Sequence, residues 1–271
     1  SLDLSRKAAS TNADVIVFCG VKFMAEVANI LNPEKLVIIP DINAGCSLED
    51  SCQPTEFAKF REKYPDHISL TYIKCSAEIK ALSDIIVTSS NAEYIINQIP
   101  QEQPIIFAPD KYLGGYLSKK TGRDMVLWDG TCIVHEQFSE KELVKLKTRH
   151  DDALIIAHPE CPEDLLKYAD HIGSTSSLLK FTADNAGKKF IVLTEEGIIH
   201  QMRKKSPNSE FFPVAGFEGG CAFCNTCPYM RLNNLEKLYL AMLNKMPQIK
   251  VKDDIRQQAV ISLNKMLEMS P

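Results

Sequence analysis

Tyr72-Ile73-Lys74-Cys75-Ser76-Ala77-Glu78 and the following Asp84-Ile85-Ile86-Val87-Thr88-Ser89 decide the fold, because both stretches occur a second time. The second copies are His158-Pro159-Glu160-Cys161 and Asp170-His171-Ile172-Gly173-Ser174-Thr175, displaced by 86 residues (161 − 75 = 86). A repeat at fixed spacing indicates one structural unit used more than once. Around each copy, apolar strands alternate with helical segments over short connections, which is typical of parallel sheets. The sequence therefore predicts an α/β fold built from small parallel sheets.

Cys46 and Cys132 occupy equivalent places in this repeat. They also lie 86 residues apart (132 − 46 = 86), and each follows a predicted strand and turn and precedes a helix. A third copy begins with the strand at residues 190–195 and should carry a cysteine at the same place. Equivalent cysteines from three repeats meet if the repeats pack around a pseudo-threefold axis.

The third copy offers three cysteines, in the run Gly219-Gly220-Cys221-Ala222-Phe223-Cys224-Asn225-Thr226-Cys227. The end of the following helix, marked by Pro247, selects among them. The spacing from Cys227 to Pro247 (247 − 227 = 20) is close to the spacing from Cys46 to Pro65 in the first copy (65 − 46 = 19). The spacings from Cys224 (247 − 224 = 23) and from Cys221 (247 − 221 = 26) are both longer. The repeat therefore selects Cys227 and leaves the other two cysteines over.

The repeat predicts three α/β domains of three layers each, related by a pseudo-threefold axis. We expect them at residues 1–48, with the C-terminal segment 235–271 packed on them, at 49–134 and at 135–234. The first copy lacks the half that would match residues 70–88. We therefore expect that about 40 further residues precede Ser1 or that another segment supplies this half. A chain that began at Ser1 is expected to have little or no activity.

Composition argues against several classes of function. The 271-residue chain has a net charge of −4 and no long run of Lys and Arg, so nucleic-acid binding is not indicated. We expect no membrane span and no signal peptide, because no apolar run is long enough. Nine cysteines, odd in number and unevenly spaced, are not typical of a secreted disulfide framework. The expected setting is a reducing cytoplasm.

Three equivalent thiols indicate metal or redox chemistry, since thiolates bind iron and zinc well. Three cysteine ligands on a [4Fe–4S] cluster leave one iron open, and that iron can act as a Lewis acid. Two alternatives stay open. In one, Cys46 and Cys132 are ordinary buried thiols. In the other, Cys221, Cys224 and Cys227 by themselves form an iron–sulfur or zinc module of a non-catalytic redox sensor.

Other polar residues stand at predicted strand ends, where α/β proteins usually bind ligands. His158 and Glu160 are two residues apart on an extended segment and could exchange protons in one cavity, although a surface loop would look the same. Tyr72 is the repeat counterpart of His158, with packing as the alternative to chemistry. His135, three residues after Cys132, would suit a zinc site. Hydroxyl groups that open helices bind anions or simply cap, and this set comprises Ser89, Ser174 and Thr175.

Several motifs in combination resemble the quinolinate synthase family over essentially the whole chain. They are Pro40-Asp41 before Cys46, Cys75-Ser76-Ala77-Glu78-Ile79-Lys80-Ala81, Val87-Thr88-Ser89-Ser90-Asn91-Ala92, Phe107-Ala108-Pro109-Asp110-Lys111-Tyr112-Leu113-Gly114, His158-Pro159-Glu160-Cys161, Gly173-Ser174-Thr175, and Thr194-Glu195 followed by Gly197 and His200. The resemblance implies three α/β domains around one [4Fe–4S] cluster. It also implies condensation of iminoaspartate with dihydroxyacetone phosphate to quinolinate, phosphate and water in NAD biosynthesis. A functional link to L-aspartate oxidase or aspartate dehydrogenase follows from that reaction.

The same resemblance assigns roles to residues. It makes Cys46, Cys132 and Cys227 the cluster ligands. Glu160 is implied as the base for tautomerisation and dehydration, with His158 as its hydrogen-bonding partner and Tyr72 on the substrate. Contacts to substrate carboxylate or phosphate groups are implied for His135, Ser1, Ser89, Ser174 and Thr175. Lys74 stands where the family has a substrate-contacting asparagine, and Cys221 and Cys224 are implied as a reversible redox pair.

Overall fold

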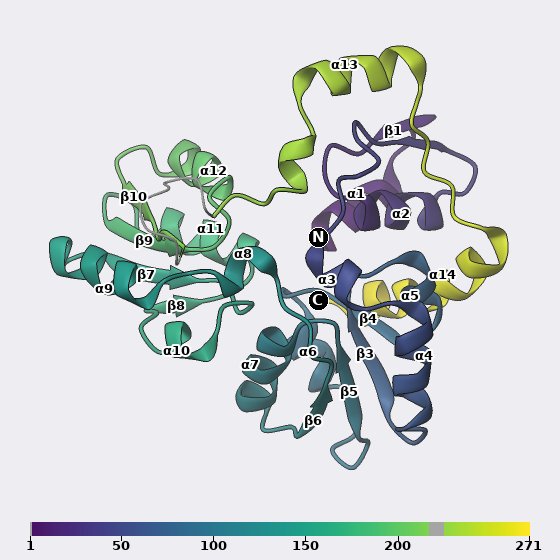
Figure 1. Ribbon diagram of the computed structural model, residues 1–271, viewed down its shortest axis with the longest axis horizontal. Helices are drawn as coiled ribbons and strands as arrows, with labels where there is room; N and C mark the ends of the chain where they lie inside the picture. The colour runs from purple at the N-terminus through teal and green to yellow at the C-terminus, as the bar shows by residue number, and fades with distance from the viewer. Residues whose placement is uncertain (1, 217–224) are drawn as a thin grey trace. The chain divides into compact units, whose positions relative to one another are not determined.

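The computed structural model describes residues 2–216 and 225–271. The chain forms two compact units, Ser1–Gly130 with Pro228–Pro271, and Thr131–Cys227. Both contain parallel strands that alternate with helices along the chain (Figure 1). The predicted α/β class with small parallel sheets is therefore confirmed. Within the described ranges, no helix is both long enough and apolar enough to cross a membrane.

The larger sheet of the first unit has four parallel strands in the order β4-β3-β5-β6. The central strands are β3 (Ile68–Tyr72) and β5 (Ile105–Ala108), and the outer ones are β4 (Ile85–Val87) and β6 (Met125–Leu127). β4 and β5 are buried along their whole length, as expected for a parallel sheet covered on both faces. The accompanying helices are α4 (Pro54–Glu62), α5 (Ala77–Ala81), α6 (Ala92–Ile96) and α7 (Lys111–Thr121).

The smaller sheet of the first unit pairs β1 (Val15–Val17) with β2 (Leu36–Ile38) in parallel. Its helices are α1 (Leu2–Ser10), α2 (Lys22–Leu31) and α3 (Ser47–Ser51). Pro33 disfavours helical backbone at Asn32, and α2 ends there. The Asn32 amide then donates to the carbonyl of Ala8 at 2.8 Å and ties α2 to α1. A small aliphatic core lies behind the sheet and includes Ala25, Ala28, Val37, Ile39, Ala44 and Ile249.

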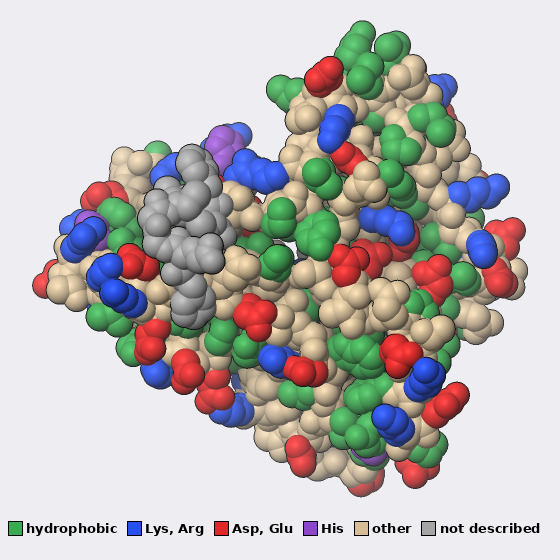
Figure 2. Space-filling model, viewed as in Figure 1, with side chains coloured by type: hydrophobic (Ala, Val, Ile, Leu, Met, Phe, Trp, Pro, Cys, Tyr) green, Lys and Arg blue, Asp and Glu red, His purple; other side chains and the backbone are tan. Residues whose placement is uncertain are grey.

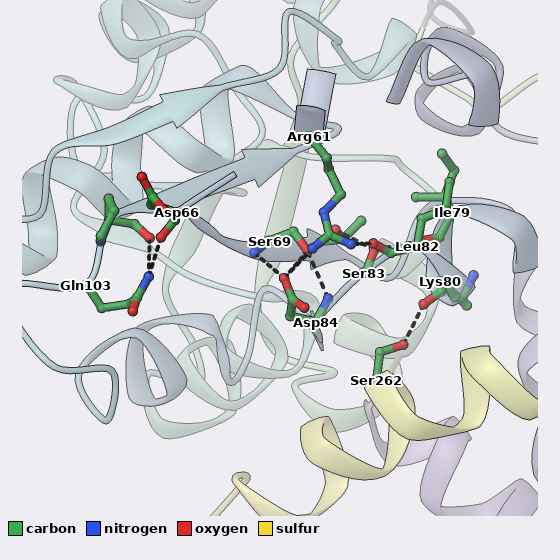
Figure 3. A network of polar contacts seen from close by, with 12 residues as sticks. Arg61, Asp66, Ser69, Ile79, Lys80, Leu82, Ser83, Asp84, Gln103 and Ser262 are labelled. Carbon is green, nitrogen blue, oxygen red and sulfur yellow. Dashed lines mark hydrogen bonds and ion pairs between the residues drawn. The ribbon is translucent and has the colours of Figure 1, made fainter. Parts of the chain in front are cut away.

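The C-terminal segment belongs to the first unit. It contains the 3-10 helix η1 (Met230–Leu232), α13 (Leu235–Asn244) and α14 (Asp253–Glu268). α14 packs against α5, β4 and α2, and its Ser262 hydroxyl donates to the Lys80 carbonyl at 2.7 Å (Figure 3). The predicted boundaries of three domains stay a prediction.

α13 exposes most of its large apolar side chains. Leu235 is 83% exposed and Tyr239 is 65% exposed, and Figure 2 shows hydrophobic side chains gathered over this helix at the top of the view. Ala241 is its one buried residue. The Asn234 side chain caps the helix by accepting from the Lys237 amide at 2.9 Å, and the Lys237 ammonium pairs with Asp41. The Lys237–Asp41 pair therefore attaches the start of α13 to the loop after β2, while Asn234 caps the helix itself.

The second unit contains one four-stranded parallel sheet in the order β10-β9-β7-β8. Its strands are β7 (Leu154–Ala157), β8 (His171–Ile172), β9 (Lys189–Leu193) and β10 (Glu210–Pro213). Its helices are α8 (Ile133–Glu136), α9 (Glu140–Arg149), α10 (Glu163–Leu166), α11 (Thr175–Asp184) and α12 (Ile198–Lys205). Apolar side chains from sheet and helices form the core, including Ile156, Leu178, Phe190, Val192, Met202 and Phe211.

The 86-residue repeat is present in the structure. β3 and β7 begin 86 residues apart (154 − 68 = 86), as do β4 and β8 (171 − 85 = 86), and the strand orders of the two sheets correspond. A partly buried polar detail repeats as well. The Asp84 carboxylate accepts the backbone N–H of Ser69 at 2.8 Å, and Asp170 accepts that of Ile155 at 2.8 Å. In the first unit Arg61 adds an ion pair to Asp84 at 2.9 Å (Figure 3).

Candidate active site

Cys46 and Cys132 hold equivalent structural positions, each in its own unit. Each is the N-cap of a short helix and has an extended backbone, Cys46 before α3 and Cys132 before α8. Cys132 is buried, whereas Cys46 is half-buried. The two short helices begin 86 residues apart (133 − 47 = 86), so the sequence register holds at this detail.

The spacing to the next long helix extends this equivalence to Cys227. α4 begins eight residues after Cys46 (54 − 46 = 8) and α9 begins eight after Cys132 (140 − 132 = 8). α13 begins eight residues after Cys227 (235 − 227 = 8), whereas it begins eleven after Cys224 (235 − 224 = 11). The helix starts thus have the same spacing from Cys227 as from Cys46 and Cys132, and the role of Cys227 as a ligand stays a prediction. Cys221 and Cys224 lie outside the described residues, and so does Ser1.

A buried group of chemically active side chains lies in the second unit around Cys132. The Cys132 sulfur, a ring nitrogen of His135 and a carboxylate oxygen of Glu160 are all within 4.8 Å of one another. Cys132 is the N-cap of α8 and His135 lies within that helix, whereas Glu160 comes from the loop after β7. Three different side chains, from two separate segments of the chain, thus converge on one point.

Glu160 is the centre of this group. Its side chain is fully buried, and its Oε2 lies 3.1 Å from His135 Nδ1. A buried carboxylate is costly unless a cation or a donor accompanies it. Burial alone would lower the pKa of His135, but the neighbouring Cys132 and Glu160 outweigh burial and raise it. His135 is therefore the group best placed to balance the charge of an ionised Glu160.

His158 lies on the other side of the same carboxylate. Its Nδ1 accepts the backbone N–H of Glu160 at 3.3 Å, which places the ring proton of a neutral imidazole on Nε2. Glu160 Oε1 is 3.5 Å from the same Nδ1, and the His135 and His158 rings are 4.9 Å apart. His158 can thus present an Nε2–H donor, while the Glu160 carboxyl group lies next to both histidine rings.

Thr194 is a member of this group to which the sequence assigned no role. Its hydroxyl lies 3.0 Å from His135 Nε2, and the side chain is buried at the end of β9. β7 and β9 are adjacent and parallel, with Ala157 opposite Leu193, so His158 and Thr194 follow at the same sheet edge. The signal was available, because polar residues after neighbouring parallel strands meet at one edge.

Ser174 and Thr175 lie at the start of α11 in the second unit. Ser174 is the N-cap, and its hydroxyl accepts the Ser177 amide at 3.3 Å. The Thr175 side chain is exposed at the first helical position. The described contacts give Ser174 a capping function, and anion binding at this helix start stays a prediction.

Cys227 is half-buried near the loop after β9. Its backbone N–H donates to Glu195 Oε1 at 3.3 Å, and the other oxygen of Glu195 accepts the Gly197 amide at 2.8 Å. Glu195 therefore anchors the backbone of the third predicted ligand to the same loop that begins with Thr194.

In the first unit, Tyr72 and Lys74 are neighbours at the end of β3. Tyr72 is buried, and the Lys74 ammonium lies 5.4 Å from the centre of its ring. The repeat pairs Lys74 with Glu160 (160 − 74 = 86), so a cation in one copy replaces the carboxylate of the other. Ser89 is half-buried in the turn between β4 and α6, two residues before the N-cap Asn91. The roles of these three residues stay predictions.

Comparison with known proteins agrees with the motifs. The chain matches the family described as Quinolinate synthetase A protein over residues 1–268. A protein named Quinolinate synthase from Microcystis aeruginosa (strain NIES-843 / IAM M-2473) is 60% identical over 270 residues, covering 100% of this chain and 84% of the relative. Proteins of the same name from Ehrlichia chaffeensis (strain ATCC CRL-10679 / Arkansas) and Nostoc sp. (strain PCC 7120 / SAG 25.82 / UTEX 2576) are 62% and 60% identical, each over 100% of this chain and over 86% and 83% of the relative. The chain therefore belongs to the quinolinate synthetase A protein family.

Proposed function

We propose that this chain is a quinolinate synthase of NAD biosynthesis, which condenses iminoaspartate with dihydroxyacetone phosphate and releases quinolinate, phosphate and water. Family membership supports the reaction. The observation that carries the proposal is the fully buried Glu160 between two histidines, because a condensation with repeated dehydration needs a positioned base and acid. A reducing cytoplasm is the proposed setting, and L-aspartate oxidase or aspartate dehydrogenase is the proposed source of iminoaspartate.

Cys46, Cys132 and Cys227 are the proposed ligands of a [4Fe–4S] cluster. The donor set fits, since three thiols stand at equivalent places, each eight residues before a long helix, and iron–sulfur clusters are held by thiolates. When bound, a cluster with three cysteine ligands supplies one open iron that acts as a Lewis acid on a substrate oxygen or nitrogen.

Glu160, His158 and His135 are proposed to supply the proton transfers and the substrate contacts of the reaction. Glu160 is proposed to accept protons during tautomerisation and dehydration, because its carboxylate is buried and accompanied by the cationic His135. His158 donates through Nε2–H to a substrate oxygen, since its Nδ1 is occupied by a backbone amide. His135 keeps a positive charge in the site and thereby favours the anionic carboxylate and phosphate groups of the substrates.

The remaining anion contacts are proposed for hydroxyl groups and for one cation. They are assigned to Lys74, Ser89, Ser174, Thr175 and Ser1, whereas Tyr72 is proposed to act with Glu160 as a catalytic residue that moves protons. Lys74 offers an ammonium where the resemblance leads us to expect an amide, and an ammonium can pair with a carboxylate as a point charge.

The buried Cys132–His135–Glu160 group favours one rival, because cysteine, histidine and carboxylate also suit zinc. In that reading the protein is a non-catalytic zinc or redox-sensing module, to which Cys221, Cys224 and Cys227 could also contribute. Metal analysis of protein purified without oxygen separates the two. Iron with inorganic sulfide supports the synthase, and zinc without sulfide supports the rival.

Glu160→Gln tests the catalytic proposal. Quinolinate formation from freshly generated iminoaspartate and dihydroxyacetone phosphate should fall by at least about 100-fold, the usual contribution of a general base. Glu210→Gln is the matched control, because Glu210 is an exposed carboxylate on β10 of the same unit. A Glu160→Gln protein with wild-type turnover would remove Glu160 from the mechanism.

A further inference from the structure

A strap, defined here as residues 228–237, runs over the first unit directly after Cys227. Three of its side chains attach it there. The Tyr229 hydroxyl donates to Asp50 Oδ2 at 2.8 Å, the Asn233 amide donates to the Gly20 carbonyl at 2.9 Å, and the Lys237 ammonium pairs with Asp41. Asp50 lies on α3, whereas Gly20 and Asp41 lie in the loops after β1 and β2, so the strap is attached to α3 and to the carboxyl ends of both strands of the smaller sheet.

Of the three attaching residues, Tyr229 is the nearest in sequence to Cys227. It contacts one residue before Cys46 and one residue after it. Its ring lies against Gly45, where an added Cβ would be 3.5 Å from Cδ1 of the tyrosine. Its hydroxyl reaches Asp50, whose backbone N–H donates to the Cys46 carbonyl at 2.9 Å. Gly45 and Asp50 bracket Cys46, so the ring and the hydroxyl together fix this segment against the strap.

Chain connectivity extends this attachment to Cys227. Cys227 precedes Tyr229 by two residues, and two residues of extended chain span at most about 7 Å. On its other side, the Cys227 amide is held by Glu195 at 3.3 Å. Chain connectivity therefore keeps Cys227 within about 7 Å of Tyr229, the residue that attaches the start of the strap to the first unit.

We propose that Tyr229 and Asp50 are positioning residues for the iron–sulfur cluster. They hold the strap, and with it Cys227, to the segment of Cys46, so that two thiolates far apart in the sequence (227 − 46 = 181) serve one cluster. When the ligands are already held close together, the protein loses less conformational entropy as the cluster binds. The inference rests on the proposed function, which assigns both cysteines to the cluster, and it gives Tyr229 no part in the reaction.

Tyr229→Phe tests the proposal, because it removes the hydroxyl and keeps the ring against Gly45. The measurement is the rate at which a ferrous chelator removes iron from anaerobic protein, followed by the visible absorption of the cluster. Because this hydrogen bond is exposed to solvent, its loss should have the effect of a typical rather than a strong hydrogen bond, so the rate of iron release should be roughly five times faster. Tyr239→Phe, which alters an exposed tyrosine on α13, is the matched control and should release iron at the wild-type rate.

Asp50→Ala should reproduce the acceleration, and the double variant should be no faster than either single variant, because one bond is lost only once. If Tyr229→Phe does not fold, judged by circular dichroism, the Asp50→Ala rate decides by itself. Wild-type release rates in these variants, or effects that add in the double variant, would overturn the inference. A wild-type protein without iron and sulfide would instead refute the proposed function, and the inference with it.

Discussion

Glu49 makes the stability of the first unit depend on pH. Its side chain follows Cys46 by three residues on α3, is 9% exposed, and has an Oε2 without a hydrogen-bond partner among the described residues. Burial, and then the charge of Glu26, raise the pKa of Glu49 from 4.5 to about 7, although Lys80 and Lys22 oppose them. A difference between 4.5 and about 7 corresponds to about 3 kcal/mol, at about 1.4 kcal/mol for each pH unit.

The sign follows from which state holds the proton. Between pH 4.5 and 7 the folded protein keeps the Glu49 proton that the unfolded chain releases, so this residue lowers the free energy of unfolding as the pH rises through that window. Well above pH 7 the contribution of the Glu49 proton to the free energy of unfolding is fully lost. Glu49→Gln removes the titrating group, so the variant should be more stable than the wild type at pH 8 by up to about 3 kcal/mol, and nearly equal to it at pH 4.5.

Urea unfolding followed by circular dichroism, at several pH values from 4.5 to 8, measures this difference. Glu62→Gln is the control, since Glu62 is exposed on α4 of the same unit, and its difference from the wild type should stay small at every pH. A Glu49→Gln difference that is flat with pH, or a variant that is less stable than the wild type at pH 8, would refute the reasoning.

Three further predictions concern the repeat and the site. Asp84→Ala should cost roughly 2–3 kcal/mol and Asp170→Ala roughly 1 kcal/mol in urea unfolding, because Asp84 accepts bonds from Arg61, Ser69 N and Ser69 Oγ whereas Asp170 accepts the Ile155 amide; equal costs would contradict the comparison. Thr194→Val should lower quinolinate formation about tenfold, and Thr194→Ser should restore it, because the hydroxyl bonds His135; a fully active valine variant would show that this contact is dispensable. His135 should remain protonated at pH 8 in the metal-free protein, since Cys132 and Glu160 raise its pKa; ring NMR shifts of a neutral imidazole at that pH would count against the charge assigned to it.

The repeat made much of the fold predictable from the sequence. The 86-residue register located equivalent strands, the equivalent longer helices that follow Cys46 and Cys132, and the aspartates that hold Ser69 and Ile155. These features are local, and each copy carries its own version of them. The packing of α14 on α5 and β4 was not predictable in this way. These elements are far apart in the sequence, and the repeat contains no counterpart of this contact.

The candidate site was partly predictable. His158 and Glu160 were identified from their place after a strand, and the structure shows that their side chains meet His135 and Cys132 in one buried group. The charge state of His135 depends on three-dimensional neighbours, so the sequence pattern did not reveal it. The position of Thr194 directly after a predicted strand was a signal that the sequence analysis did not use. The attachment of Tyr229 to Asp50 was also hidden, because 179 residues separate the partners (229 − 50 = 179).

The central claim is that three cysteines from distant parts of the chain hold one cluster, and the iron and sulfide content of Cys46→Ala tests it most directly. Cys19→Ala is the matched control, because Cys19 is an exposed cysteine of the same unit. Purified without oxygen, the wild type and Cys19→Ala should contain about four irons and four sulfides per chain, and Cys46→Ala should contain close to none. A Cys46→Ala protein that keeps the full complement of iron and sulfide would contradict the account.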